Sequence, residues 1–310
     1  MAEVSVVIPA YNEAGSVGAT VESVVKAFEG ASHEYEIIVV DDGSEDDTAD
    51  MAEAAGARVV RHPCNIGYGH SIQTGVRAAR YPLIATTDAD GTYPVHELPA
   101  MVEELDRRGL DMLVGARKGR FYHGGIVKRL ARAAFKFLSE FTVGRRIPDV
   151  NSGLRVIRRE LIEDFTSVLC GGFSFSTTIT MIAMLSGRFV DFRPISYHER
   201  TGRSKVRYFR DVLGTAQILV SAILVFNPVK IFLIFSAGVT AVGGAAAALC
   251  FFFPRLAVPV IAAGAFFISA CILLGMGFVI EQRRASSRDF NLPRRRFDDD
   301  GAPPAGRLTS

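Results

Sequence analysis

The strongest constraint on the fold is an alternation, over the first hundred residues, of short β-branched segments with longer amphipathic ones. The short segments are residues 4–8, 36–40, 57–60 and 83–86. Each has the length and composition of a buried strand. Between the first two, one helical face carries Val17, Val21, Val24, Val25 and Phe28. Because strand–helix–strand units join parallel strands by right-handed connections, the sequence predicts an α/β fold with a mostly parallel, Rossmann-like sheet.

Each predicted strand runs into a cluster of polar residues. The clusters are PAYNE (9–13), DDGSEDDT (41–48), RHPCNIGYG (61–69) and DADG (88–91). The carboxyl ends of parallel strands lie at one edge of a sheet, and ligands bind beyond that edge, so we expect the four clusters to meet. A lone Asp-x-Asp pair is weak evidence, since turns use the same residues. Four polar strand ends at one edge predict a binding site.

The chemistry of these clusters favours a nucleotide diphosphate. Asp88 and Asp90, two residues apart on a loop, can hold Mg²⁺ or Mn²⁺ through oxygen, and such a cation would neutralise a departing diphosphate. Asp41 and Asp42 could accept hydrogen bonds from a base or ribose, and Tyr11 could stack on the base. The sequence has no GxGxxG after the first strand and no Walker A motif. Metal and basic side chains are therefore expected to hold the phosphates.

Two long apolar segments, residues 229–253 and 256–280, occupy the C-terminal part of the chain. Each exceeds the roughly 20 residues that cross a bilayer core as a helix, so both are predicted to span a membrane. A buried helical hairpin is the alternative, but it would need a larger core than this chain can supply. The short turn between them carries only Arg255.

Basic residues on both sides of these segments predict the topology. They are Arg200, Arg203, Lys205, Arg207 and Arg210 before the first, and Arg283, Arg284, Arg288 and residues 294–296 after the second. By the positive-inside rule, the chain is expected in the inner or plasma membrane with both termini and the catalytic domain cytoplasmic. The predicted organisation is a catalytic domain (1–210), an interfacial helical segment (211–227), a two-helix anchor (228–281) and a basic, disordered tail (282–310).

The overall charge argues against a nucleic-acid partner. The 35 basic and 33 acidic residues nearly cancel, leaving a formal charge of +2. Lys128, Arg132 and Lys136 fall at helical spacing, which usually indicates a solvated face. Next to a membrane anchor, contact with anionic lipid headgroups is the favoured interpretation.

Six motifs in order resemble those of family 2 glycosyltransferases of the GT-A fold, specifically the polyprenyl-phosphate transferases similar to dolichol-phosphate mannose synthase. They are VSVVIPAYNEAGSV, VVDDGSEDDT, NIGYGHSIQTGVRAA, TDADGTYP, VNSGLRVIRRE and ERTGRSK. The resemblance covers residue 4 to about residue 210. It implies inverting transfer of a hexose or hexose derivative from a nucleotide-diphosphate sugar, UDP- or GDP-linked, to a polyprenyl phosphate.

The resemblance also implies roles for individual residues. The nucleoside would be bound by Pro9, Tyr11, Glu13, Asp41, Asp42, Gly43 and Asp88. Asp88 and Asp90 would face the metal and the diphosphate, and Asp90 is the preferred assignment for the metal ligand. The acceptor phosphate would be bound by Arg117, Ser152 and Arg155, and the donor diphosphate by Arg200, Arg203, Ser204 and Lys205. Asp88, Asp90, Arg117 and Arg155 would thus be the catalytic set. For Arg155 and Arg200, ordinary surface pairing is the alternative.

Two departures from the family pattern concern the sugar. Thr92 stands where mannose-type members often have glutamine, and Ser176, Thr177 and Thr178 stand where they usually carry glutamate or glutamine. These residues put a mannose donor in doubt and leave the reaction class in place. The sugar, the base, the isoprenoid length and assembly into homo-oligomers are left open.

Other functions would share part of this pattern. A processive polysaccharide synthase would need a Gln-x-x-Arg-Trp motif, and the chain contains no tryptophan. A membrane-bound sugar-nucleotide sensor without turnover, or a transferase acting on another lipid or glycan, would keep the fold. The presence of Asp88, Asp90, Arg117 and Arg155 favours catalysis.

Overall fold

The computed structural model describes residues 1–118, 136–137, 139–166, 175–197, 228–252 and 258–286. The chain divides into two compact units. Met1–Thr215 and Leu292–Ser310 form the first, and Ala216–Asn291 form the second. The domain limits predicted at residues 210 and 227 fall outside the described residues, so they stay predictions.

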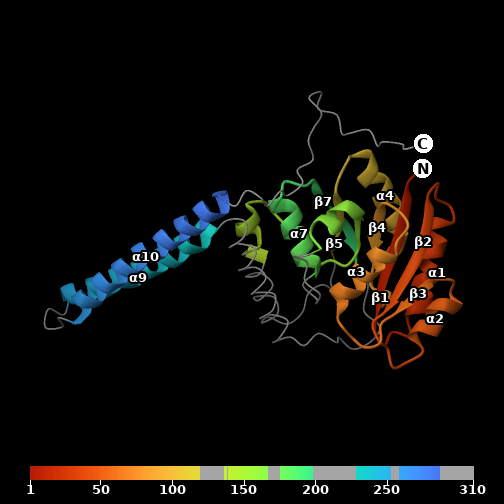
Figure 1. The fold of residues 1–310 in the computed structure, drawn as a ribbon, viewed down its shortest axis with the longest axis horizontal. Helices are drawn as coiled ribbons and strands as arrows, with labels where there is room; N and C mark the ends of the chain where they lie inside the picture. Colours follow the sequence, from red (N-terminus) through yellow and green to blue (C-terminus); the bar gives the residue numbers. More distant parts are fainter. Residues whose placement is uncertain (119–135, 138, 167–174, 198–227, 253–257, 287–310) are drawn as a thin grey trace. The chain divides into compact units, whose positions relative to one another are not determined.

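A seven-stranded sheet forms the centre of the first unit (Figure 1). The strands are β1 (Glu3–Ala10), β2 (Glu34–Asp41), β3 (Arg58–Arg61), β4 (Leu83–Thr86), β5 (Met112–Lys118), β6 (Arg155–Arg158) and β7 (Val190–Ser196), in the spatial order β3-β2-β1-β4-β6-β5-β7. Only β6 runs antiparallel to its neighbours β4 and β5. The predicted α/β fold with a mostly parallel sheet is confirmed, and all four predicted strands are present.

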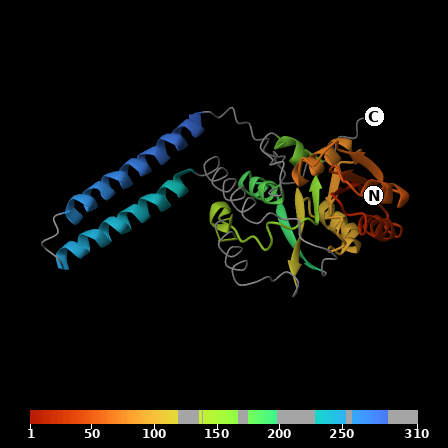
Figure 2. The same cartoon turned by 90° about the horizontal axis from the view of Figure 1, so that it is seen from below.

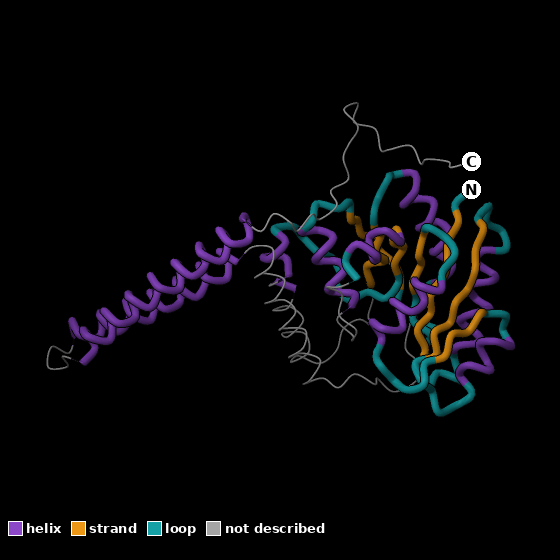
Figure 3. The backbone as a smooth tube through the Cα atoms, in the orientation of Figure 1, coloured by secondary structure: helices purple, strands orange, loops and turns teal. Residues whose placement is uncertain are grey.

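Helices cover both faces of this sheet (Figure 3). They are α1 (Val17–Phe28), α2 (Thr48–Ala54), α3 (Tyr68–Ala78), α4 (Leu98–Arg107), α6 (Arg159–Asp164) and α7 (Phe175–Leu185), with a short 3₁₀ turn η1 (Val95–Glu97) before α4. α1 contacts both α2 and α4, whereas α3 contacts both α6 and α7. Burial on both faces explains why the central strands β1, β2 and β4 are mostly apolar.

Alternate residues of β1 pack against the helices on the two faces of the sheet. Val6 and Ile8 belong to the core cluster that also contains Val21 and Phe28 of α1. On the predicted face of α1, Val25 alone is only partly buried. Val7 packs against α3, where a Cβ built on Gly75 would lie 2.3 Å from Val7 Cγ1. Glycine at this position therefore lets α3 lie directly on the sheet.

The direction of β6 determines which loops lie at the edge formed by the carboxyl ends of the parallel strands, here called the functional edge. Because β1, β2, β3 and β4 are parallel, their carboxyl ends share one edge. β6 enters the sheet from that same edge, and its first residue, Arg155, pairs with Thr86 of β4 and Val114 of β5. The loop 149–154 is thereby placed beside the loop that follows β4.

The second unit contains helices α9 (Pro228–Phe252) and α10 (Val258–Ser286), which lie side by side (Figure 2). A Cβ on Gly277 would lie 2.8 Å from Phe232 Cβ, so glycine permits close contact between them. Several large apolar side chains stay exposed on both helices: Leu233, Ile234, Phe235, Val242, Phe267, Ile268, Ile272, Met276 and Val279. A search of the described residues identified no helix with the length and hydropathy of a membrane span. The described parts of both apolar segments are helical, and their crossing of a bilayer stays a prediction.

Candidate functional site

The loops after β1 and β2 are tied together by hydrogen bonds. The Asn12 amide donates to Ser44 Oγ at 2.9 Å, and the Glu13 amide donates to Thr48 Oγ1 at 2.8 Å. In return, Asn12 Oδ1 accepts from the Glu45 amide at 2.8 Å. Asn12 has a φ of +51°, a left-handed conformation that asparagine tolerates better than most residues. These bonds hold the half-buried Tyr11 and Glu13 at the functional edge.

Asp42 stabilises the loop after β3. Its carboxylate accepts from the Ile66 amide at 3.0 Å and the Gly67 amide at 2.8 Å. His62 Nδ1 lies 2.9 Å from Asp42 Oδ1, while His62 Nε2 lies 3.0 Å from Thr74 Oγ1. Both oxygens of this buried carboxylate therefore bind the protein itself.

Asp41, Gly43 and Pro9 support the same edge in different ways. Asp41 Oδ1 accepts from the Ser44 amide at 3.0 Å. Gly43 has a φ of +72°, and a Cβ there would lie 2.5 Å from the carbonyl carbon of Cys64, so only glycine fits. Pro9 is a buried residue inside β1, in register with β2. Of these three, Asp41 is the residue with a charged side chain at the strand end.

A turn built on Asp90 shapes the loop after β4. Asp90 Oδ1 accepts from the Thr92 amide at 3.1 Å and from Thr92 Oγ1 at 2.6 Å, with Gly91 at a φ of +70° between them. From α1, Thr20 Oγ1 donates to the Ala89 carbonyl at 3.1 Å. Thr92, a departure from the family pattern, thus fixes the Asp90 carboxylate.

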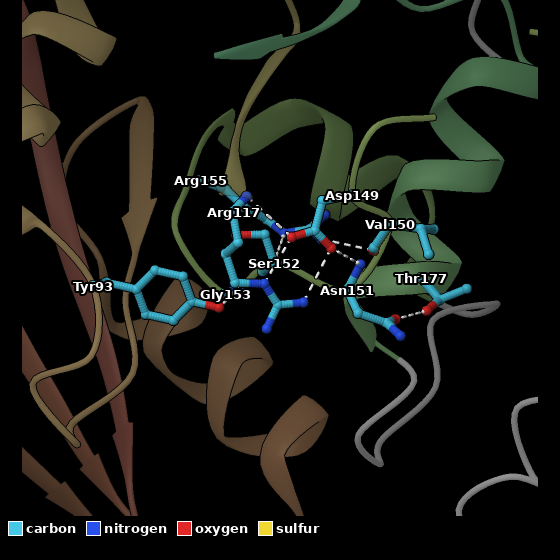
Figure 4. A network of polar contacts seen from close by, with 9 residues as sticks. All are labelled: Tyr93, Arg117, Asp149, Val150, Asn151, Ser152, Gly153, Arg155 and Thr177. Carbon is cyan, nitrogen blue, oxygen red and sulfur yellow. Dashed lines mark hydrogen bonds and ion pairs between the residues drawn. The ribbon is translucent and has the colours of Figure 1, made fainter. Parts of the chain in front are cut away.

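Asp88 meets the loop 149–154 at Gly153. A Cβ on Gly153 would lie 2.7 Å from Asp88 Oδ1, so the carboxylate rests directly on the glycine backbone. The Gly153 amide donates to Tyr93 Oη at 2.7 Å, and its carbonyl accepts from Thr86 Oγ1 at 2.6 Å. Figure 4 shows the Tyr93 hydroxyl directed at this loop. The loop after β4, which carries Asp88 and Asp90, is therefore joined to the loop before β6 by these contacts.

Gly153→Ala is expected to lower activity with little loss of stability. The added Cβ would push the Asp88 carboxylate aside, and misplacing a reacting group by about 1 Å can cost about 100-fold in rate. We expect kcat to fall roughly 10- to 100-fold. Steady-state kinetics and a thermal melt would measure this. Gly30→Ala, where a Cβ meets nothing within 4 Å, is the matched control. Normal kcat in Gly153→Ala would contradict the role expected of Asp88 from the sequence.

Arg117 and Asp149 form a two-pronged ion pair (Figure 4). Arg117 Nε donates to Asp149 Oδ2 at 2.7 Å and Nη2 donates to Oδ1 at 3.0 Å. The guanidinium carbon also lies 5.4 Å from the centre of the Tyr197 ring, a cation–π contact. Burial alone would raise the pKa of Asp149, but the hydrogen bonds and charge of Arg117 outweigh it and hold that pKa below its ordinary value. The pair is charged at neutral pH.

Arg155 is enclosed within the protein. Its side chain is among the largest that are fully buried, with the residue only 1% exposed. Nε donates to the Ser152 carbonyl at 2.7 Å, Nη2 to the Val150 carbonyl at 3.0 Å, and Nη1 to Thr180 Oγ1 at 2.8 Å. Burial lowers the pKa of Arg155 to about 10, so it remains charged at neutral pH. The sequence suggested either an acceptor ligand or a surface ion pair; the buried side chain is not a surface ion pair, and contact with the acceptor stays a prediction.

The neighbouring hydroxyl groups belong to the same loop and to α7. Ser152 Oγ is buried and has no hydrogen-bond partner among the described residues. Thr177 Oγ1 donates to Asn151 Oδ1, and Ser176 hydrogen-bonds the Tyr68 hydroxyl. Burial raises the pKa of Tyr68 well above its ordinary value. The hydroxyl-bearing residues that replace the family's glutamate or glutamine therefore pack into the site rather than facing solvent.

With this geometry in view, the family follows from one comparison. Residues 5–166 match the model of glycosyl transferase family 2. The chain belongs to this family. That span contains most of β1, all of β2 to β6, the Asp88 and Asp90 loop and the loop before β6. The membership predicted from the ordered motifs is confirmed.

Relatives of this family 2 glycosyltransferase include lipid-phosphate sugar transferases. A dodecaprenyl-phosphate galacturonate synthase from Rhizobium johnstonii is 36% identical over 167 residues, which are 52% of this chain and 49% of that protein. A dolichyl-phosphate hexose transferase from Haloferax volcanii is 33% identical over 212 residues, which are 67% of this chain and 88% of that protein. The match thus spans about half the length of the first relative and most of the second.

A solved structure shares the fold of this family 2 glycosyltransferase. It is glucosyl-3-phosphoglycerate synthase from Mycobacterium tuberculosis in complex with Mn²⁺, UDP and glucosyl-3-phosphoglycerate. The TM-score is 0.60 at 23% identity, over 71% of this chain and 80% of that one. The GT-A fold expected from the motifs is supported by this likeness.

Some predicted site residues of the glycosyltransferase lie outside the described residues. They are Arg200, Arg203, Ser204 and Lys205 of the expected diphosphate group, and Lys128 and Arg132 of the expected headgroup stripe. Lys136, the third residue of that stripe, is described and lies 3.8 Å from the Glu140 carboxylate. In the described part of the chain, no three acidic, histidine or cysteine side chains gather closely enough to form a metal site by themselves.

Two residues of the glycosyltransferase site were missed by sequence reasoning. Asp149 holds Arg117, and Tyr93 holds the Gly153 backbone. Tyr93 stands inside TDADGTYP, and Asp149 directly precedes VNSGLRVIRRE. The available signal for Asp149 was its position three residues before Ser152, in a segment that also contains Arg155. Tyr93 carried no signal, because its partner is 60 residues away.

Proposed function

We propose that this family 2 glycosyltransferase is a membrane-anchored, inverting polyprenyl-phosphate glycosyltransferase. It transfers a hexose or hexose derivative from a UDP- or GDP-linked sugar to a polyprenyl phosphate and so makes a lipid-linked sugar donor. The observation that carries the proposal is the contact between the Asp88 carboxylate and Gly153, in the loop whose Asp149 holds Arg117. It brings residues suited to a metal-bound diphosphate against residues suited to a second phosphate.

The donor nucleoside is assigned to the edge formed by β1 and β2. Tyr11, Glu13 and Asp41 are the residues that would contact it, with Pro9 and Gly43 shaping the wall. Asp41 is the better candidate than Asp42, because both Asp42 oxygens accept hydrogen bonds from the loop after β3. Arg200, Arg203, Ser204 and Lys205 are proposed to close over the donor diphosphate.

Asp88 and Asp90 are the proposed ligands of Mg²⁺ or Mn²⁺. The fit rests on the donor set: two carboxylates on one loop, with Asp90 fixed by Thr92 through one of its oxygens. Hard divalent cations prefer such oxygen ligands and accept the rest from substrate phosphates. When bound, the cation would stabilise the negative charge that develops on the departing diphosphate.

The acceptor needs little acid–base help from the protein. A monophosphate has a second pKa of about 6, so it is largely ionised near neutral pH. Its oxygen would attack the anomeric carbon while the bond from that carbon to the donor phosphate breaks on the opposite side, leaving a nucleoside diphosphate. Arg117, aimed by Asp149, would offset the repulsion between the two anionic substrates. The buried hydroxyl of Ser152 is proposed to donate to an acceptor oxygen.

The α9–α10 pair is the proposed anchor. Large apolar side chains remain exposed on both helices, Phe235 by 56% and Phe267 by 63%, where water would be an unfavourable surrounding. An anchor in the inner or plasma membrane, with both termini and the catalytic unit cytoplasmic, would confine the enzyme to the surface that holds its lipid substrate. Assembly of several copies through these helices is compatible with that arrangement.

A donor panel with paired acceptors tests the proposal. The purified full chain would be mixed with Mg²⁺ or Mn²⁺, with UDP- and GDP-linked sugars, and with a ten-carbon isoprenyl phosphate or the matching alcohol. We expect a sugar–phospholipid product from the phosphate only, detected by mass spectrometry. Donor binding without turnover would indicate the sensor, and transfer to the alcohol or to a glycan would indicate a different acceptor; either result would overturn the proposal.

A further inference from the structure

Arg155 closes a loop around its own side chain. Its guanidinium bonds the carbonyls of Val150 and Ser152, which lie five and three residues earlier in the chain. The same loop is held at Asn151, whose amide donates to Asp149 Oδ1 at 3.1 Å, and at Gly153 through Tyr93. The direction of the loop thus depends on a side chain that is itself buried.

Among the described residues, the hydrogen-bond partners of Arg155 are all neutral. They are two backbone carbonyls, Thr180 Oγ1 and Met112 Sδ, the last at 3.8 Å from Nη1. No ion pair joins Arg155 to a carboxylate among the described residues. Asp149, the acidic residue of this loop, is bound by both prongs of Arg117. Burying a charge among neutral groups is costly unless another charge compensates it.

Two positive and two negative groups surround this loop. Arg117 and Arg155 are the positive ones; Asp149 pairs with Arg117, and Asp88, a proposed metal ligand, rests on Gly153. The effective dielectric constant inside a protein is far below that of water, which strengthens the pull of such a charge on a nearby anion. A phosphate bound beside this loop would be attracted by the buried charge of Arg155, which has no ion pair among the described residues.

We propose that Arg155 is a positioning residue for the acceptor phosphate: it acts through the loop 149–153 and through its buried charge, without touching the substrate. The inference rests on the proposed function and specifies how that site recognises a phosphate. It replaces the direct contact expected from the sequence. Ser152 and the Arg117–Asp149 pair present the contacting atoms, and Arg155 fixes where they point.

Three variants of the full chain separate this role from direct contact and from simple loss of stability. Arg155→Met removes the charge and the loop bonds, whereas Arg155→Lys keeps a charge and loses the paired bonds. Thr180→Val removes one hydrogen-bond partner of Arg155 from α7 without altering any charge. Ile182→Val, also buried on α7, is the matched control for a small loss of packing.

Two measurements are made on each variant. The first is the rise in melting temperature with a ten-carbon isoprenyl phosphate compared with the matching alcohol. The second is steady-state kinetics with the accepted donor. Arg155→Met is expected to raise the acceptor KM about tenfold or more, and Thr180→Val about threefold, with donor KM changed less than about twofold. Arg155→Lys should fall between Met and wild type. Because a buried charge is poorly screened, the ratio of mutant to wild-type KM should hold from about 50 to about 500 mM salt.

Each alternative result overturns the inference. Unchanged phosphate binding in a folded Arg155→Met would remove the role altogether. Normal acceptor KM in Thr180→Val beside a large defect in Arg155→Met would indicate direct contact. If Arg155→Met does not fold, Arg155→Lys and Thr180→Val decide, and both must shift the acceptor KM more than Ile182→Val does. A wild-type chain that responds to neither isoprenyl phosphate nor any donor would instead contradict the proposed function.

Discussion

Asp90→Asn is expected to lower kcat by roughly 1,000-fold while leaving the fold intact. The substitution keeps an oxygen that can accept from the Thr92 amide and hydroxyl, so the turn at residues 90–92 survives. What it removes is one negative charge from the pair that would hold Mg²⁺ or Mn²⁺. The cation would then bind weakly and the departing diphosphate would lose its charge stabilisation. Product formation at saturating donor and acceptor, over a range of Mn²⁺ concentrations, measures the effect.

The control for this prediction is Asp50→Asn. Asp50 lies on α2, with its side chain 71% exposed and paired only with the exposed Arg61 among the described residues. It should keep normal kcat. Partial recovery of Asp90→Asn at high Mn²⁺ would place the defect in metal affinity. Full activity of Asp90→Asn without added metal would contradict the assignment of the acidic loop.

The sheet could be predicted because its strands are local signals. Residues 4–8 and 36–40 are apolar on both faces, and helices bury both faces, so composition alone identifies them as strands. Because these strands are parallel, their polar carboxyl ends meet at one edge of the sheet. The sequence of β6 is less typical of a strand, because RVIR is short and has an arginine at each end. Its antiparallel entry between β4 and β5 joins segments some 70 residues apart, which no local pattern encodes.

The site was predictable in its residue types and less so in their roles. The sequence placed Asp88 and Asp90 at the functional edge because strand ends and acidic pairs are visible in one dimension. The sequence could not show which of Asp41 and Asp42 is free to bind a ligand. The amides that donate to Asp42 come from residues 66 and 67, which lie far along the chain. It also could not tell that Arg155 is buried, because arginine usually lies at the surface and Thr180 is a neutral partner on a distant helix.

Asp149→Asn is expected to destabilise the first unit by about 3–5 kcal/mol, since breaking one side of a buried ion pair leaves a buried charge without compensation. For a unit of this size, the melting temperature should fall on the order of 10 °C. Arg117 would also lose the carboxylate that orients it, so the acceptor KM should rise in parallel. Circular dichroism melts and acceptor kinetics measure the two effects.

The double variant Arg117→Met with Asp149→Asn tests whether the pair acts as a unit. Removing both charges should cost less stability than the sum of the two single losses, with a coupling on the order of 1–3 kcal/mol. Strict additivity would show that the bidentate contact contributes nothing beyond packing. A pair of exposed residues, Arg61 with Asp50, gives the comparison, because such pairs couple by less than about 1 kcal/mol.

The pH dependence of stability follows from the lowered pKa of Asp149. Burial opposes the charged form, but Arg117 lowers the pKa in the folded state below its ordinary value, so the unfolded chain binds the proton more readily. The stabilising contribution is therefore complete above the ordinary carboxyl value of about 4 and is lost as the pH falls through the lower folded value. The gap in melting temperature between wild type and Asp149→Asn should narrow below about pH 4 and stay constant above about pH 5. A gap that widened on acidification would contradict the charged state assigned to this pair.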